Sequence, residues 1–560
     1  MSRRSSSVGR RPSVNVHPPD LVIGIDFGMT GTAVAYASGL DKEVKVLKSW
    51  QDASNDCDKV PTAVAYKGDE LVGWGFGVRD QENTAVVVKA FKGVIDQRVL
   101  AHFKTQNPHL DNQMTRYDTT AWLQDYLEQL RKHLESRLQS ALPQGMSWDQ
   151  SEILYLFSYP ATWDHDTQST FKKTIGKAGF DASGPHRIKV TMNEAKAAVA
   201  SVFANKTLPS PGEHLIVVDI GGGMSDVGVF AVQPDKDKGP IPHLEPKFHE
   251  CGINIGSSKI DEVFENKVKE RLKPAIRKMV AKDVADTTVE ALAAAAIRKV
   301  SGHESYLAAK HGYGGPKGSH LVRPDFPVPD AALIGDQNWK ESICPLFFNK
   351  DELFGPAYES QCKEIWKLLL VCMKTLDSKD PAKGGDNDTL DLPSLKEKKL
   401  RIVLSGGMGK SPYVQDFLRK KLSELRIETP LDVADKPQLV VCRGLVESEL
   451  RHLRDEDIWM YRAKVSYGVI LRRAGGQEVS TTIVVSKDAQ VETRQIIKVQ
   501  IRIPTDDYET CELYLAQFPD HSVPRRYSFT RPNYGTARIV GPVLSSNHTG
   551  RPPVEAEIQG

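Results

Sequence analysis

The chain has 560 residues, of which 40% are hydrophobic and 26% charged, a mix typical of folded globular proteins and unlike that of disordered or membrane chains. A formal net charge of +2, with no basic stripe interleaved with aromatic residues, argues against nucleic acid as a partner. The seven scattered cysteines contain no Cys-x-x-Cys pair, which argues against a zinc site or a redox dithiol.

Residues 1–19 are rich in Arg, Ser and Pro, and we expect them to form a disordered basic tail. The segment lacks the apolar stretch of a signal peptide, and no later run is long enough to cross a bilayer. We therefore expect a cytoplasmic or nuclear location and no membrane span.

A first glycine-rich turn lies between two apolar stretches, at 21–26 and 33–36. Two such stretches joined by a short turn predict a β-hairpin. The turn has the sequence Asp26-Phe27-Gly28-Met29-Thr30-Gly31.

A second segment later in the chain resembles the first. The apolar run 215–219 leads into Ile220-Gly221-Gly222-Gly223-Met224-Ser225-Asp226, and an apolar stretch resumes at 227–232. In both segments a strand ends in Asp, and the turn contains Gly and Met followed by a hydroxyl residue. Because each segment opens a region that alternates strands with amphipathic helices, we predict two duplicated α/β half-domains whose turns face one cleft.

Three amphipathic helices are predicted from apolar residues at helical spacing, at 123–138, 260–272 and 414–425. The last helix follows a strand at 402–404 and a third glycine-rich turn, Ser405-Gly406-Gly407-Met408-Gly409-Lys410-Ser411. Beyond about residue 465 the pattern changes to alternating strands, such as 481–485 and 496–503. These strands predict a small β-rich C-terminal region.

The expected fold class is therefore α/β, with two related lobes and a β-rich C-terminal region. Lobe one would span 20–212 and lobe two 213–464, followed by the C-terminal region at 465–560. An Ala-rich stretch and a Gly/Pro-rich loop predict an inserted subdomain at about 273–400. A surface loop is predicted at 381–391 within it.

The glycine turns suit a nucleotide triphosphate, because glycine lets backbone N–H groups approach phosphate oxygens without a Cβ in the way. Magnesium bound to such phosphates keeps several waters, which carboxylates orient, a role that fits Asp26, Asp219 and Asp226. Taken singly, Asp26 and Asp219 read more simply as turn caps, but their matching positions favour the magnesium role. A Walker A loop at Gly409 is excluded, because Leu404 stands where that motif requires glycine.

Five motifs occur in a specific order and spacing. They are Gly24-Ile25-Asp26-Phe27-Gly28, Tyr159-Pro160-Ala161-Thr162-Trp163, Asn193-Glu194-Ala195, Asp219-Ile220-Gly221-Gly222-Gly223, and Ser405-Gly406-Gly407 through Ser411-Pro412-Tyr413. In these motifs the chain resembles the heat shock protein 70 family, within the superfamily of actin, sugar kinases and heat-shock ATPases. The resemblance covers about residues 20–470 and looks closest to the divergent, twelve-A-like branch. Smaller matches are Gly256-Ser257-Ser258, Arg443-Gly444 and Ser466-Tyr467-Gly468.

The resemblance implies duplicated actin-like ATPase lobes, ribonuclease H-like in fold, around a cleft for ATP or ADP with Mg2+. Asp26 and Asp219 would hold Mg2+ through water, and Glu194 and Asp226 would orient the attacking water. A family lysine would reach the γ-phosphate, with Lys92 as the first choice and Lys89 as the alternative. The implied nucleotide-binding residues are Gly28, Met29, Thr30, Gly221, Gly222, Gly223, Met224 and Ser225 at the phosphates, and Gly406, Gly407 and Met408 at the adenosine.

The chain departs from the family in both phosphate turns, where Met29 and Met224 replace the usual threonines. A thioether accepts hydrogen bonds poorly and donates none. Loss of one hydroxyl that stabilises a transition state costs about 2.7–4 kcal/mol, so binding can survive while hydrolysis slows. Thr30 and Ser225, one residue later, are candidates to compensate. The family's acidic, leucine-rich linker and helical lid are also missing, which shortens any peptide-binding domain.

Three functions follow as hypotheses. The leading one is a heat-shock-70-like chaperone ATPase, in which slow hydrolysis shifts the lobes and thereby the binding of client proteins or co-chaperones. The two methionines favour an alternative, a nucleotide-sensing scaffold or pseudo-ATPase that holds ATP without cleaving it. A small-molecule kinase with an Asp as base toward a polyol hydroxyl is the third, although the sequence has no substrate motif for it.

Overall fold

The structure is a computed structural model and divides into two compact units, Met1–Phe230 with Lys247–Glu456, and Ala231–Pro246 with Asp457–Gly560. Of the predicted tail at 1–19, all but the last two residues lie outside the described part of the chain. The described residues are 18–38, 41, 43–81, 84–106, 116–182, 184–205, 210–233, 243–247, 251–280, 283–301, 304–315, 321–322, 348–377, 395, 398–454, 456, 458–459, 461–462, 466–473, 478–485, 490–491, 496–501, 511–518, 526–528, 538–546 and 554–559.

The first sheet is built on the hairpin predicted at the start of the chain. Its strands are β1 (Leu21–Phe27), β2 (Gly31–Ser38), β3 (Lys45–Val46), β4 (Val60–Pro61), β8 (Ile153–Tyr159) and β9 (Arg187–Asn193). β1 and β2 are antiparallel, whereas β8 runs parallel to β1 and β9 parallel to β8. The order is β3-β2-β1-β8-β9, with β4 also paired to β2.

The second sheet repeats this arrangement with the second predicted strand pair. Its strands are β10 (His214–Ile220), β11 (Ser225–Gln233), β12 (His243–Pro246), β13 (Cys251–Ile253), β16 (Leu400–Ser405) and β17 (Leu431–Val433). The order is β12-β11-β10-β16-β17, with β13 also paired to β11. β16 runs parallel to β10 and β17 parallel to β16. In both sheets, two parallel strands therefore extend a turn-linked pair on the side of its first strand.

The described α-helices all belong to the first unit. They are α1 (Gln97–Gln106), α2 (Arg116–Leu138), α3 (His165–Lys177), α4 (Glu194–Asn205), α5 (Ser258–Met279), α6 (Asp286–Ser301), α7 (Glu304–His311), α9 (Lys350–Asp377), α11 (Pro412–Glu424) and α12 (Val440–Leu453). Short 3-10 helices occur at Gly75–Gln81, Gly93–Ile95, Gln139–Ala141, Trp148–Gln150 and Met408–Lys410. The helices predicted at 123–138, 260–272 and 414–425 correspond to α2, α5 and α11.

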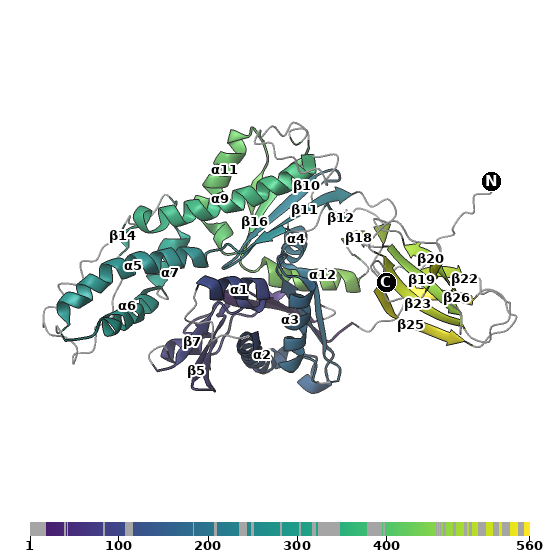
Figure 1. Ribbon diagram of the computed structural model, residues 1–560, viewed down its shortest axis with the longest axis horizontal. Helices are drawn as coiled ribbons and strands as arrows, with labels where there is room; N and C mark the ends of the chain where they lie inside the picture. Colours follow the sequence, from purple (N-terminus) through teal and green to yellow (C-terminus); the bar gives the residue numbers. More distant parts are fainter. Residues whose placement is uncertain are drawn as a thin grey trace. The chain divides into compact units, whose positions relative to one another are not determined.

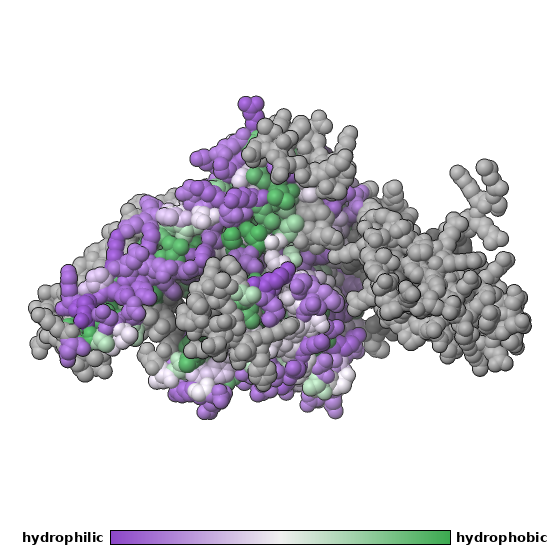
Figure 2. All heavy atoms as spheres, viewed as in Figure 1, coloured by the Kyte–Doolittle hydropathy of each residue, from purple (hydrophilic) through white to green (hydrophobic). Residues whose placement is uncertain are grey.

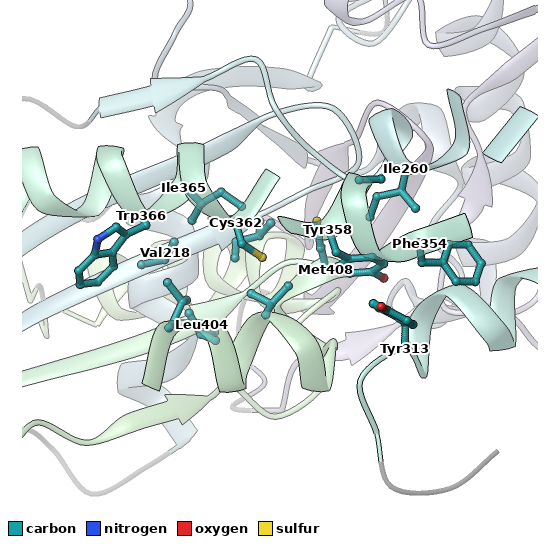
Figure 3. Packing of buried hydrophobic residues seen from close by; sticks show 14 of the residues in the cluster. Val218, Ile260, Tyr313, Phe354, Tyr358, Cys362, Ile365, Trp366, Leu404 and Met408 are labelled. Carbon is teal, nitrogen blue, oxygen red and sulfur yellow. The ribbon is translucent and has the colours of Figure 1, made fainter. Parts of the chain in front are cut away.

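Each sheet buries one face in a hydrophobic core of its own. In β1, alternate residues, Leu21, Ile23 and Ile25, pack in one core with the predicted apolar face of α2. In β10 the alternate residues Ile216, Val218 and Ile220 pack in a second core with α5, α9 and α11. Figure 3 shows part of this second core, in which Val218 and Leu404 of the sheet lie beside Cys362 and Ile365 of α9. Because side chains alternate along a strand, Asp26 of β1 and Asp219 of β10 each lie on the face of the strand that points away from the core just described.

Two helices, α4 and α12, pack closely against each other in the first unit (Figure 1). α4 follows β9 of the first sheet and α12 follows β17 of the second. A Cβ placed on Gly444 of α12 would lie only 1.7 Å from the carbonyl oxygen of Ala197 in α4. One on Gly24 of β1 would lie 2.4 Å from the carbonyl oxygen of Cys442. Glycine at these two positions therefore lets α12 approach both α4 and β1.

The remaining elements of the first unit lie outside the two large sheets. They are a three-stranded sheet of β5 (Ala63–Lys67), β6 (Glu70–Trp74) and β7 (Val86–Lys89), and a pair of β14 (Leu321–Val322) and β15 (Phe348–Asn349). α5 continues through residue 273, where the inserted subdomain was expected to begin, and contains Pro274 within the helix. The loop predicted at 381–391 lies outside the described residues.

The second unit is rich in strands, as predicted. Every described element from Tyr461 onward is a strand. The strands are β18 (Tyr461–Arg462), β19 (Ser466–Arg473), β20 (Glu478–Val485), β21 (Gln490–Val491), β22 (Ile496–Ile501), β23 (Cys511–Phe518), β24 (Arg526–Ser528), β25 (Arg538–Ser546) and β26 (Val554–Gln559). Of these, β20 and β22 correspond to the strands expected at 481–485 and 496–503. A five-stranded antiparallel sheet has the order β24-β20-β19-β23-β25.

Hydrophilic residues predominate on the described surface that Figure 2 draws. Among the described helices, none combines the length and the apolar character that crossing a bilayer requires. The chain is thus a mixed α/β protein with a strand-rich second unit.

Candidate functional site

The first glycine turn is held in place by a neighbouring threonine. The turn joins β1 to β2, and the Thr62 hydroxyl donates to the carbonyl oxygen of Gly28 at 2.8 Å. The Thr62 backbone N–H also donates to the carbonyl oxygen of Thr30 at 3.3 Å. These two bonds fix the carbonyls of the turn.

A lysine that the sequence does not predict neutralises the carboxylate of the first turn. Lys59 Nζ lies 2.8 Å from Asp26 Oδ2, and the Asp26 side chain is only 8% exposed. Burial alone would lower the pKa of Lys59, but the charge of Asp26 and the hydrogen bond to it outweigh burial and raise that pKa. Asp26 therefore already has a cationic partner within the chain.

The second turn is held by the start of α5. Within the turn, the Gly221 N–H donates to the Met224 carbonyl oxygen at 2.9 Å. The backbone N–H groups of Ser257 and Ser258 donate to the carbonyl oxygens of Gly221 and Gly222 at 3.1 and 2.7 Å. The Gly256-Ser257-Ser258 segment thus packs directly against the predicted phosphate turn.

The two turns contact each other. A Cβ placed on Gly222 would lie 2.5 Å from the Thr30 hydroxyl oxygen, and one on Gly223 would lie 2.2 Å from Met29 Cε. Both distances are shorter than any real Cβ contact, so the glycines leave the space that the side chains of the first turn fill. The structure thus brings together the two turns that the sequence predicts to face one cleft.

The two methionines have different surroundings. Met29 is half-buried and lies against Gly223 of the second turn and against Gly93, where an added Cβ would be 2.7 Å from its Cε. Met224 is buried, and its sulfur accepts a hydrogen bond from the Thr162 hydroxyl at 3.6 Å. Met29 therefore fills space between segments, whereas Met224 packs against the Tyr159–Trp163 motif.

Lys92 and Glu194 form a buried ion pair. Lys92 Nζ lies 2.6 Å from Glu194 Oε1, and the lysine side chain is 2% exposed. Its ammonium also lies 5.8 Å from the ring centre of Phe27 and 5.7 Å from that of Trp163, within the range of cation–π attraction. Lys89, the alternative, is exposed at the end of β7. Lys92 is thus the lysine that the fold brings to the predicted acid.

Two acids of the second turn carry raised pKa values. Burial, followed by the charge of Glu194, raises the pKa of Asp219 to about 7, although the Ser405 hydroxyl donates to Asp219 Oδ1 at 2.8 Å. Burial and the charges of Glu194 and Asp219 raise the pKa of Asp226 well above its ordinary value. Asp226 Oδ1 accepts from the Ala161 N–H at 3.1 Å, but Oδ2 has no hydrogen-bond partner among the described residues. The buried acids therefore repel one another.

The third glycine turn lies beside Asp219. Gly406 has a left-handed backbone with φ of +77°, and a Cβ there would lie 2.2 Å from the Ile220 carbonyl oxygen and 2.8 Å from Asp219 Oδ1. Gly407 is exposed. Met408 is buried in the second core, where Figure 3 shows it beside Tyr358. A ligand at this turn would therefore meet Gly407 and not Met408, which is buried as a whole.

Glycines line the facing turns, and their backbone N–H groups can approach phosphate oxygens closely. The site also holds four carboxyl groups, Asp26, Asp219, Asp226 and Glu194, and two lysines, Lys59 and Lys92, each of which is paired with one of them. The surroundings of Asp26 do not fit a divalent cation, because the Lys59 ammonium already neutralises this carboxylate. Within the described part of the chain, no group of three or more His, Cys, Asp and Glu side chains is arranged to hold a metal.

No protein-family model matches this chain, and no curated protein matches it significantly. The resemblance to the heat shock protein 70 family therefore rests on the quoted motifs and stays a prediction.

Proposed function

We propose that the first unit binds ATP or ADP between the two glycine turns. The observation that carries this proposal is the contact of Gly222 and Gly223 with Thr30 and Met29, in a place surrounded by buried acids and lysines. Glycine backbone in facing turns offers N–H donors to phosphate oxygens from two sides. The third turn, at Gly406 and Gly407, would contact the nucleoside.

The repeated strand order supports the interpretation of the unit as two actin-like lobes. Each sheet contains an equivalent turn-linked strand pair that is extended by two parallel strands. A helix follows the last of these strands, α4 in the first sheet and α12 in the second. Duplicated sheets that place equivalent turns opposite each other are what a two-lobed nucleotide site requires. Under the same proposal, the protein is heat-shock-70-like, and the five-stranded sheet of the second unit would bind a client or another protein partner.

Calorimetry of the full chain with ATP and with ADP tests the proposal. We expect both nucleotides to bind, and we expect Lys92→Met to weaken ATP binding by about tenfold, the equivalent of one lost charge-assisted hydrogen bond. Lys89→Met is the matched control and should bind as the wild type does, because Lys89 is exposed on β7. Circular dichroism verifies that Lys92→Met remains folded, since Glu194 loses its partner. Absence of binding by the wild type would reject the proposal.

A second candidate is a pseudo-ATPase that senses nucleotide without cleaving it. The position of Met29 favours this candidate, because its thioether lies between Gly93 and Gly223 and donates no hydrogen bond. Single-turnover hydrolysis on the calorimetry sample separates the two functions. Tight binding with no measurable phosphate release would support the sensor, and release at a rate far above that of free ATP would support the ATPase.

A further inference from the structure

Lys59 is the cationic side chain of the site that no motif accounts for. Its ammonium contacts Asp26 at 2.8 Å, while the side chain as a whole remains 30% exposed. The ion pair thus neutralises a buried carboxylate, while part of the lysine side chain stays exposed.

The backbone holds Lys59 next to the first turn. The following strand, β4, pairs with β2 through Gly31 opposite Pro61 and Thr32 opposite Val60. A Cβ placed on Gly31 would lie 3.4 Å from the Lys59 Cβ, and one on Gly28 would lie 3.9 Å from its Nζ. The ammonium is therefore adjacent to the glycine whose N–H is expected to meet phosphate.

Four carboxyl groups and two lysines make up the charge of the site. The facing carboxyl groups are Asp26, Asp219, Asp226 and Glu194, and Lys92 is paired with Glu194. Nucleotide phosphates add several negative charges to this set. Lys59 is the lysine paired with Asp26, and Asp219 lies close enough to it to interact electrostatically.

We propose that Lys59 is a tethered cation that takes the place of a divalent metal at Asp26, so that this chain binds nucleotide phosphates without Mg2+. The inference rests on the proposed nucleotide binding. An ammonium has three N–H donors, so Lys59 can donate to Asp26 and to a phosphate oxygen at once. Lysine is also an established phosphate ligand that acts as a point charge.

The test measures ATP affinity of the full chain by calorimetry, once with excess MgCl2 and once with excess EDTA. We expect the wild-type dissociation constants to agree within about threefold, which corresponds to less than one charge-assisted hydrogen bond. Binding that is seen only with MgCl2 would overturn the inference while leaving the proposed function intact. Absence of binding in both buffers would instead reject the proposed function.

Three variants locate the effect. In EDTA, Lys59→Met should weaken ATP binding by about tenfold or more, and MgCl2 should restore part of the loss, because Asp26 is then open to the metal. Lys59→Arg keeps the charge and should bind in EDTA nearly as the wild type does. Lys67→Met removes an exposed lysine of β5 and should change nothing. Unaltered binding of Lys59→Met in EDTA would overturn the inference.

Discussion

The two glycine turns differ more in charge than in sequence. Asp26 of the first turn has a lysine partner, whereas Asp219 and Asp226 of the second turn are buried next to Glu194 and hold their protons to higher pH. The side chains also differ, since Met29 projects to the opposite turn and Met224 is buried against Thr162. Similar motifs can therefore form one turn whose carboxylate is neutralised by a lysine and another whose carboxyl groups repel a neighbouring acid.

The largest expected effect concerns hydrolysis. The double variant Met29→Thr/Met224→Thr introduces two hydroxyls at the phosphate turns. We expect phosphate release in single turnover to rise by about a hundredfold or more for each hydroxyl that stabilises the transition state. Met29→Thr should account for most of the gain, because Met29 lies between the turns while Met224 is packed against Thr162. ATP affinity, measured in parallel, is the control. Equal rates in the double variant and the wild type would remove the methionines as the cause of slow hydrolysis.

The second effect is on stability at high pH. The Asp219 pKa is raised from 3.8 to about 7 in the folded state, so between these pH values the folded chain holds more protons than the unfolded chain. Stability then falls as pH rises through this window and stays lower above it. Asp219→Asn removes the titration, and at pH 8 we expect it to raise the free energy of unfolding by about 2–4 kcal/mol.

Urea unfolding followed by tryptophan fluorescence at pH 8 and pH 5 checks the Asp219→Asn prediction. The gain should shrink at pH 5, because the wild-type carboxyl is already protonated there. The hydrogen bond from Ser405 remains possible, since an amide oxygen also accepts. A variant that is less stable than the wild type at pH 8 would contradict the assigned charge state.

A smaller effect tests the contact between the turns. Gly223→Ala places a methyl group where Met29 Cε lies, and overpacking of this kind costs about 1–3 kcal/mol. We expect Met29→Ala to rescue most of this loss, so that a double-mutant cycle measured by urea unfolding shows strong coupling. Gly407→Ala is the matched control, because nothing lies within 4 Å of its Cβ position. Additive effects of the first two substitutions would mean that the turns do not touch.

The smallest effect has the opposite sign to that of Asp219→Asn. Asp26→Asn removes the anionic partner of Lys59. The Lys59 side chain is 30% exposed, so water can partly solvate its unpaired charge, and we expect the free energy of unfolding to fall by only about 1 kcal/mol. The same urea experiment at pH 8 measures it. If Asp26→Asn instead raised the free energy of unfolding, the Asp26 carboxylate would be destabilising like that of Asp219, and the contrast between the two turns would be wrong.

The elements were predictable because they depend on local pattern. The spacing of Leu123, Leu127, Leu130, Leu134 and Leu138 places them on one helix face, and all are buried in α2. The paired turns were likewise predicted to face each other, because each follows an apolar strand that ends in Asp.

The ion pairs of the site were harder to predict because they join residues far apart in the chain. Lys59 and Asp26 are 33 residues apart, and Lys59 belongs to no motif, so no sequence signal indicates the pair. Motif resemblance alone predicts Lys92 rather than Lys89, and the contact of Lys92 with Glu194 spans 102 residues. The Met408 side chain illustrates the reverse case, since it belongs to a predicted turn but is buried in the core.

α4 and α12 pack closely against each other where they cross. Their backbones meet at Gly444 and Ala197, where a single methyl group would not fit. Ala197 is one helical turn from Glu194, the acid that pairs with Lys92. An alanine at Gly444 would clash with the Ala197 carbonyl group, and we expect the resulting shift of α4 to displace Glu194 and so to alter the proposed site from a position outside it.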